Sequence, residues 1–188
     1  FAMSQSGETF DTLSALKYSQ AKGAKTAAIV NVMGSSIARM VDQVILQGSG
    51  PEICVISTKA ALSQMVVLTL IAMKLGLKKK VISKKIYQEN YNSLKDLPAI
   101  IQGILNERSG FIHRIAHKYC KNKNWLYLGR GIYYPIALEA ALKMKEVAYV
   151  HAEGMPGGFL KHGTLAMIDD EIFSIVFVPP KEKKDLYQ

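Results

Sequence analysis

Residues 1–32 read FAMSQSGETFDTLSALKYSQAKGAKTAAIVNV, and their order of apolar and polar segments predicts the fold. The apolar residues 1–3 predict the end of a strand, and residues 9–21 predict a helix that Gly23 ends. The run Thr26–Val32 is apolar almost throughout, which is typical of a strand buried on both faces of a parallel sheet. A strand, a polar loop, a helix and a buried strand in this order favour an α/β layered fold.

The same pattern continues downstream. The tripeptide GSS at residues 34–36 predicts the start of a short helix, and residues 43–47 predict a short strand. The sequence EICVISTKAA at residues 52–61 predicts another strand, and Ser57–Thr58 then open a long helix that reaches about Leu75. The carboxyl ends of neighbouring parallel strands meet at one edge of a sheet, so we expect the loops after these strands to line one crevice.

The middle of the chain, residues 86–124, is more polar and predicts a helical connector between two lobes. Proline is favoured in the first turn of a helix, so Pro98 predicts the start of one helix. A second helix is expected over about residues 111–121.

A second lobe begins at the predicted strand Trp125–Leu128. Pro135 predicts the start of a helix that runs to about Tyr149, and residues 172–178 predict a last strand. Both lobes lack strands of a complete sheet, which indicates a fragment of a larger protein. The expected organisation is two mainly parallel, doubly wound α/β subdomains at residues 1–85 and 125–188, joined by the connector at residues 86–124.

Composition and charge limit the classes of function. With 188 residues, of which 49 % are hydrophobic and 21 % charged, the chain can bury a core. Its longest apolar run, residues 65–73, is too short to span a membrane. The net charge is +9, but the basic residues are scattered and are not interleaved with aromatic residues. We therefore expect no nucleic-acid or membrane partner, and the basic excess suits an anionic small molecule.

Cysteine and histidine give no sign of a metal or cofactor. We expect Cys54 and Cys120 to be buried small hydrophobic residues of a protein in the reducing cytoplasm. His113 and His117 are spaced as HxxxH on a helix, without the glutamate of a zinc-protease motif or a third ligand nearby. No metal and no cofactor are expected.

The loop SQSGET, residues 4–9, has the composition of an anion site. Ser4, Ser6 and Thr9 supply hydroxyl donors, and Gly7 lets the backbone approach a ligand closely. The helix that follows offers free N–H groups and a partial positive charge. No lysine follows in a Walker frame and no GxGxxG occurs, so a phosphomonoester fits better than a nucleotide. The alternative is a plain helix cap made by Ser6 or Thr9.

The helix at residues 135–149 carries three charged side chains that could do chemistry. Glu139, Lys143 and Glu146 are spaced by four and three residues, so they share one face. They form either a solvent-exposed stripe of ion pairs or, if this face lines a crevice, a proton carrier beside an ammonium. His162, in a glycine-containing turn, is a further acid–base candidate.

Five segments of the chain occur in the order found in one protein family. They are SQSGETFDTL, GSS, EICVISTKAA, LGRGIYYPIALEAALKMKEVAYVHAEG and LKHGTLAMI, and they extend over nearly the whole chain. The chain thus resembles the sugar isomerase (SIS) region of the glutamine–fructose-6-phosphate aminotransferase, or glucosamine-6-phosphate synthase, family. The serine-rich loop is common to all SIS domains, whereas the run ALExALKxKE…HAE…LKHG is far more specific.

The resemblance implies two SIS subdomains, a site for fructose 6-phosphate or glucosamine 6-phosphate, and a cytoplasmic homodimer. It assigns to Glu146 the transfer of a proton between C1 and C2, with Lys143 and Glu139 in support. It assigns ring opening to His162, which the neighbouring subunit would supply. The residues that it places against the substrate are Ser4, Gln5, Ser6, Thr9, Val55 (through its backbone) and Ser57.

The chain also departs from the family pattern. Phe159 stands before LKHG, where the family usually has glutamate, so a carboxylate is lost there. The glutaminase domain with its N-terminal cysteine, an expected partner in the full-length chain, is absent, as is the C-terminal tail whose lysine can form a Schiff base with the open-chain sugar. The fragment alone is therefore expected neither to release ammonia from glutamine nor to isomerise well.

Two other functions remain open at this point. A stand-alone SIS-type glucosamine-6-phosphate deaminase would share nearly all of these motifs and lack the glutaminase domain. A non-catalytic sugar-phosphate-sensing SIS module would need the loop at residues 4–9 but no proton carrier. The joint presence of Glu139, Lys143, Glu146 and His162 favours an enzyme.

Overall fold

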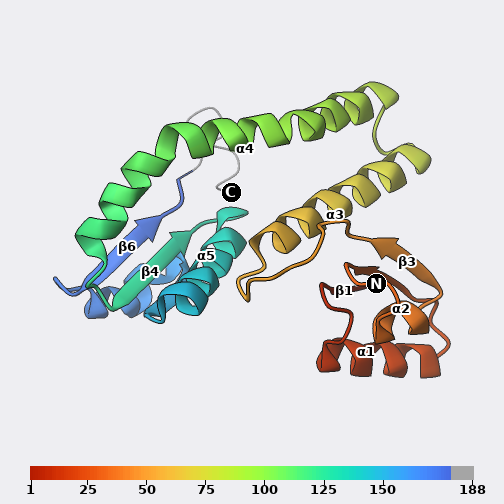
Figure 1. Cartoon of the computed structure of the whole chain (residues 1–188), viewed down its shortest axis with the longest axis horizontal. Coiled ribbons are helices and arrows are strands. Elements are labelled where there is room, and N and C mark those ends of the chain that lie inside the picture. The colour runs from red at the N-terminus through yellow and green to blue at the C-terminus, as the bar shows by residue number, and fades with distance from the viewer. Residues whose placement is uncertain (179–188) are drawn as a thin grey trace. The chain divides into compact units, whose positions relative to one another are not determined.

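The computed structural model describes residues 1–178 of the chain (Figure 1). The chain divides into two compact units, Phe1–Gly103 and Ile104–Gln188. The boundary between them falls within α4 (Lys84–Tyr119). The subdomain limits inferred from the sequence stay predictions.

The first unit is built on a small parallel sheet. Its strands are β1 (Ala2–Ser4), β2 (Ala27–Val30) and β3 (Gln43–Leu46), in the order β1-β2-β3. The last residues of the three strands, Ser4, Val30 and Leu46, pair in register at the carboxyl edge. Three consecutive residues of β2, 28–30, are fully buried, as expected for a strand covered on both faces.

Two helices cover one face of this sheet. α1 (Phe10–Ala21) contributes Leu16 and α2 (Ser36–Met40) contributes Ile37 to a core cluster with Ala28 and Val30. The predicted short helix at GSS is confirmed, and Ser35 caps it because its Oγ accepts the Ala38 N–H.

α3 (Thr58–Lys78) is the predicted long apolar helix. By length and composition it could cross a bilayer, since its most apolar 18-residue window has a mean hydropathy of 1.8. The expectation that no segment is long and apolar enough for a span is therefore wrong for α3 on these two criteria. A core helix of a soluble protein passes the same test, so one such helix is weak support for a membrane protein.

α4 runs unbroken through Pro98, so the two helices expected in the middle of the chain are one. A proline inside a helix removes one backbone hydrogen bond and costs about 3 kcal/mol or more. Long helical segments on both sides continue the helix, because propagation adds one hydrogen bond for each residue fixed.

The strand expected within residues 52–56 is wrong. Residues 51–57 form a loop, in which Ile53 and Val55 are exposed and Pro51 has no N–H to donate to a sheet. The buried environment expected for the cysteines is also wrong, because Cys54 lies in this exposed loop and Cys120 lies, exposed, just after α4.

The second unit holds another parallel sheet, in the order β5-β4-β6. β4 (Asn124–Gly129) is central, and β5 (His151–Pro156) and β6 (Ile172–Val176) flank it. The fold class inferred from the sequence is confirmed as α/β, with two parallel three-stranded sheets flanked by helices. β5 was not predicted from the sequence.

α5 (Tyr133–Ala148) packs closely on this second sheet. Ala137 and Ala141 are buried against Trp125, Tyr127 and Ala152. Gly154 on β5 permits the close approach, because a Cβ there would lie 2.7 Å from the Leu138 Cα and 2.8 Å from the Ala137 carbonyl oxygen. Two short 3₁₀ helices follow β5, at Gly157–His162 (η1) and Thr164–Met167 (η2).

Candidate functional site

The hydroxyl loop at residues 4–9 is an ordered network that starts at the last residue of β1. Ser4 is buried, its Oγ lies 2.8 Å from the Thr9 Oγ1, and the same Oγ accepts the Gly7 N–H at 3.0 Å. The Ser6 Oγ accepts the Glu8 N–H at 3.2 Å. The hydroxyl groups thereby hold the loop in a tight turn at the carboxyl edge of the sheet.

Replacement of Gly7 by any residue with a Cβ would strain this turn. Its φ of +69° lies in the left-handed region, which residues with a Cβ rarely adopt. A Cβ at Gly7 would also overlap the Ser35 hydroxyl and lie 2.5 Å from the Ser35 Cβ. The loop after β1 therefore lies directly against the loop that opens α2.

Glu8 joins the same two loops through its carboxylate. The Ser36 N–H donates to the Glu8 Oε1 at 2.8 Å. Hydrogen bonds from the Ser36 backbone and side chain lower the pKa of Glu8 from its ordinary value of 4.5, aided by the charge of Arg39, although burial opposes this shift. Glu8 is therefore ionised near neutral pH and acts as a structural tie between the loops.

The start of α1 keeps free donors in its first turn. Thr9 occupies the N-cap position, but its side chain makes no capping hydrogen bond and contacts Ser4 instead. The alternative of a plain helix cap made by Thr9 is therefore wrong. Ser6 does not cap the helix either, because its Oγ accepts the N–H of Glu8, which precedes α1. The first N–H groups of an uncapped helix can bind an anion.

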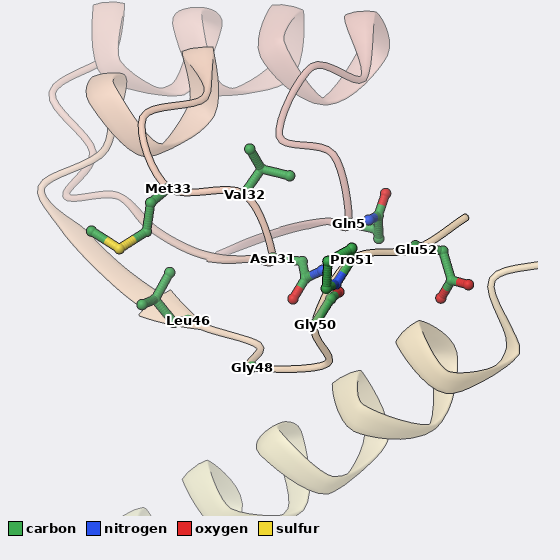
Figure 2. Close-up of a pocket in the computed structure, with 9 residues that line it drawn as sticks. All are labelled: Gln5, Asn31, Val32, Met33, Leu46, Gly48, Gly50, Pro51 and Glu52. Atoms are coloured by element: carbon green, nitrogen blue, oxygen red, sulfur yellow. The ribbon is translucent and has the colours of Figure 1, made fainter. Parts of the chain in front are cut away.

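A cavity of about 630 Å³ opens at the same carboxyl edge, between the strand ends and the loop that follows β3 (Figure 2). Gln5 is the one predicted substrate residue among those drawn in Figure 2. Asn31 lies beside the loop, where its amide donates to the Gly50 carbonyl at 2.7 Å and its Oδ1 accepts the Ser49 N–H at 3.1 Å. The lining residues are Gln5, Asn31, Val32, Met33, Leu46, Gly48, Gly50, Pro51 and Glu52.

Two of these lining residues were missed by sequence reasoning. Asn31 directly follows β2, a position that the rule of strand carboxyl ends could have marked. Glu52 has one buried carboxylate oxygen, Oε2, without a hydrogen-bond partner in the part of the chain that the structure describes. No sequence pattern marked Glu52.

The second predicted contact loop leads into α3. Val55 is 83 % exposed, so this residue is open to a ligand. Ser57 precedes α3 with φ 50° and ψ 36°, a left-handed conformation that is unusual for a non-glycine residue and is enriched at ligand sites. Its N–H donates to the Cys54 carbonyl at 3.3 Å, which closes the turn.

The three charged residues of α5 form the ion pairs that their spacing predicts. The Lys143 Nζ donates to the Glu146 Oε2 at 2.6 Å and lies 3.5 Å from the Glu139 Oε1. Exposure falls from 47 % for the Glu139 side chain to 26 % for Glu146 and 19 % for Lys143. The pair Lys143–Glu146 is thus the more sheltered end of the stripe.

Lys143 remains an ammonium well above neutral pH. Burial lowers the pKa of Lys143, but its hydrogen bond to Glu146 and the negative charges of Glu139 and Glu146 outweigh this effect. The pKa of Lys143 therefore lies above its ordinary value of 10.5. A permanent positive charge beside a carboxylate suits a site in which an oxygen gains negative charge during a reaction.

His162 ends η1 in the second unit and is exposed. Its ring contacts Phe159 with a centroid distance of 6.1 Å and an interplanar angle of 67°. His113 and His117 belong to no cluster of metal-ligating side chains within residues 1–178.

The family model for the SIS domain matches residues 1–74 and 118–188. The chain belongs to the SIS domain family. The match includes the hydroxyl loop of the first unit as well as α5 and His162 of the second.

Individual relatives agree with this assignment. The SIS chain is 44 % identical over 185 residues to the isomerising glutamine–fructose-6-phosphate aminotransferase of Methanococcus maripaludis, a match that includes 97 % of this chain and 30 % of that protein. The corresponding enzyme of Fusobacterium nucleatum is 45 % identical over 92 % of this chain and 28 % of its own length. The resemblance inferred from the motifs is confirmed as homology to the isomerase region of these aminotransferases.

A solved structure extends the comparison to three dimensions. The C-terminal domain of glucosamine-fructose-6-phosphate aminotransferase from Francisella tularensis superposes with a TM-score of 0.92 at 37 % identity. The match includes 98 % of this SIS chain and 52 % of that structure. The chain spans less than a third of the length of the aminotransferases that it matches.

Proposed function

We propose that this chain is the sugar-phosphate isomerase portion of a glutamine–fructose-6-phosphate aminotransferase. The whole protein would convert fructose 6-phosphate into glucosamine 6-phosphate in the cytoplasm, with ammonia released from glutamine by a separate glutaminase domain. The observation that carries the proposal is the hydrogen bond of 2.6 Å between Lys143 and Glu146 on α5. A protein that only binds a sugar phosphate has no need of a carboxylate paired in this way.

The hydroxyl loop would hold the phosphoryl end of the substrate. Ser4, Ser6 and Thr9 would donate hydroxyl hydrogen bonds, and the free N–H groups at the start of α1 would add a partial positive charge. Gln5 would contact the sugar from the edge of the cavity, and the Val55 backbone and Ser57 would contact its hydroxyl groups. This binding mode requires no metal ion and no cofactor.

His162 would open the sugar ring. One imidazole nitrogen would accept the proton of the anomeric hydroxyl on C2, and the ring oxygen would receive a proton as its bond to C2 breaks. The C2 carbonyl forms in the same step. Imidazole exchanges protons readily near neutral pH, which suits this exchange.

Glu146 would move a proton between two carbons. After ammonia replaces the C2 carbonyl oxygen as an imine with loss of water, the carboxylate would take a proton from C1. The electron pair left on C1 forms a double bond to C2, and the C2–N double bond becomes a single bond as nitrogen takes up a proton. Glu146 would then return its proton to C2 while the C1 hydroxyl loses its own and becomes the aldehyde. Lys143 and Glu139 would hold the Glu146 carboxylate in place.

We further propose a homodimer with composite sites, in which one subunit supplies His162 to the substrate bound by its partner. The proposal follows the family resemblance and would explain why His162 is exposed in the single chain.

Replacing Glu146 by glutamine in the full-length protein tests the assignment. We expect loss of turnover by about a hundred- to ten-thousandfold, because a general base supplies about 10²–10⁴-fold. Affinity for fructose 6-phosphate should stay within about threefold of wild type. The matched control is Glu153→Gln, an exposed carboxylate of the same unit outside the proposed site, which should leave both quantities unchanged. Unchanged turnover in Glu146→Gln would refute the proton transfer.

The wild-type protein decides between the related functions. Binding of fructose 6-phosphate without turnover would replace the proposal by a sugar-phosphate sensor. Release of ammonia from glucosamine 6-phosphate, without synthesis from glutamine, would replace it by a deaminase.

A further inference from the structure

We propose that Phe159 is a positioning residue that orients the His162 imidazole for ring opening. The inference rests on the proposed function, and it concerns a position that differs from the glutamate usual in the family. Its basis is the ring contact between Phe159 and His162 at the two ends of one turn of η1.

The geometry of η1 brings the two rings together. A 3₁₀ helix has three residues in each turn, so side chains three positions apart lie on the same face. Phe159 and His162 are three apart, with ring centroids 6.1 Å apart and planes inclined by 67°. These values lie within the range of edge-to-face aromatic pairs, whose geometry is directional.

Glycines stand on both sides of His162 in the backbone. Gly157 and Gly158 begin η1, and Gly163, with φ +152°, follows His162 directly. Within residues 1–178 the His162 side chain makes no hydrogen bond or ion pair, and the Phe159 ring is its one aromatic partner. Orientation of the imidazole therefore depends on this ring contact.

An aromatic partner has a chemical consequence that a carboxylate lacks. Phenylalanine has no hydrogen-bonding atom, so it holds the ring without engaging either imidazole nitrogen. A carboxylate would accept a hydrogen bond from one nitrogen and thereby fix which nitrogen carries the proton. With Phe159 both nitrogens stay free, one to accept the anomeric proton and the other to exchange protons with solvent or the ring oxygen.

The test compares two substrates in the full-length protein. Fructose 6-phosphate reacts from its ring form, whereas 5-deoxyfructose 6-phosphate lacks the hydroxyl that closes the ring and is always open. We expect Phe159→Leu to lower kcat with fructose 6-phosphate about two- to tenfold, the range of an aromatic pair, and to leave kcat with the 5-deoxy analogue unchanged. Phe159→Tyr keeps the ring and should restore most of the rate lost in Phe159→Leu.

His162→Ala is the variant with which Phe159→Leu is compared, because it removes the imidazole itself. We expect it to show the same substrate pattern with a larger loss, and Phe159→Leu to add nothing in its presence, because a positioning residue acts only through the residue it positions. Equal losses with both substrates, or a further loss in the double variant, would overturn the proposal and indicate a structural role.

A spectroscopic measurement separates this proposal from the proposed function. In protein labelled with ¹³C at histidine Cε1, a ring above or beside the imidazole displaces the His162 resonance. The displacement should persist in Phe159→Tyr and disappear in Phe159→Leu. Wild-type protein that turns over neither substrate would refute the proposed function, whereas an identical His162 resonance in wild type and Phe159→Leu would refute the ring contact.

Discussion

Replacing Gly7 by alanine should damage the proposed phosphate loop in two separable ways. A left-handed backbone costs a residue with a Cβ about 1–2 kcal/mol, and Gly7 has φ +69°. The added Cβ would lie 2.5 Å from the Ser35 Cβ, and overpacking of this kind typically costs about 1–3 kcal/mol. The two effects together predict a loss of about 2–5 kcal/mol, unless the loop moves away from Ser35.

Gly23→Ala is a matched control for Gly7→Ala. Gly23 has φ +80°, but a Cβ there would meet nothing within 4 Å in the part of the chain that the structure describes, so only the cost of the left-handed backbone applies. The gain from a stiffer unfolded chain is the same in both variants and cancels in the comparison. The difference in stability between them is therefore the contribution of the Ser35 contact.

Two assays follow the Gly7→Ala substitution. Urea unfolding should show Gly7→Ala less stable than Gly23→Ala by about 1–3 kcal/mol. Calorimetric titration with fructose 6-phosphate should show at least about tenfold weaker binding for Gly7→Ala and near wild-type binding for Gly23→Ala. A loss of about 1.4 kcal/mol in binding free energy, caused by displacement of the loop, corresponds to a tenfold loss of affinity. Equal stability and equal affinity of the two variants would refute the reasoning from the Ser35 contact.

The other predictions concern pH and the packing of α5. Because the pKa of Glu8 is lowered by folding, its ionised form stabilises the protein above its ordinary value of 4.5, and this stabilisation is lost as the pH falls through the lowered pKa. The difference in melting temperature between wild type and Glu8→Gln should therefore be constant near neutral pH and shrink in acid, and a difference that does not vary with pH would contradict the tie to Ser36. Gly154→Ala should destabilise the protein by about 1–3 kcal/mol or more, because backbone atoms of α5 cannot yield as a side chain can. Gly158→Ala is its control, since a Cβ there meets nothing within 4 Å among residues 1–178, and similar unfolding curves for the two would contradict the packing argument.

Structural features were predicted well where the sequence pattern allows few alternative structures. The uninterrupted apolar run at residues 26–32 has few alternatives to a buried strand, and β2 is the core of the first unit. Gly23 after a helical segment marks a helix end, and α1 ends just before it, at Ala21. The spacing of Glu139, Lys143 and Glu146 predicted the ion pairs that the structure contains.

Secondary structure could not be predicted from the sequence where it depends on contacts with distant segments of the chain. Residues 52–56 are largely apolar, but no strand of the described sheet pairs with them, and they remain a loop. β5 contains alanine, glutamate, glycine and proline, which are depleted in strands, yet it pairs along its whole length with the buried β4. Cys54 lies in this loop, and its exposure was missed as well, because free cysteines are usually buried.

A crystal structure of the full-length protein with fructose 6-phosphate tests the central claim most directly. The account predicts phosphoryl oxygens within hydrogen-bonding distance of Ser4, Ser6 and Thr9, and a Glu146 carboxylate oxygen within about 3.5 Å of C1 and C2, the separation of reacting atoms in a productive complex. A phosphoryl group bound elsewhere, or a Glu146 carboxylate directed into solvent with no sugar carbon near it, would contradict it.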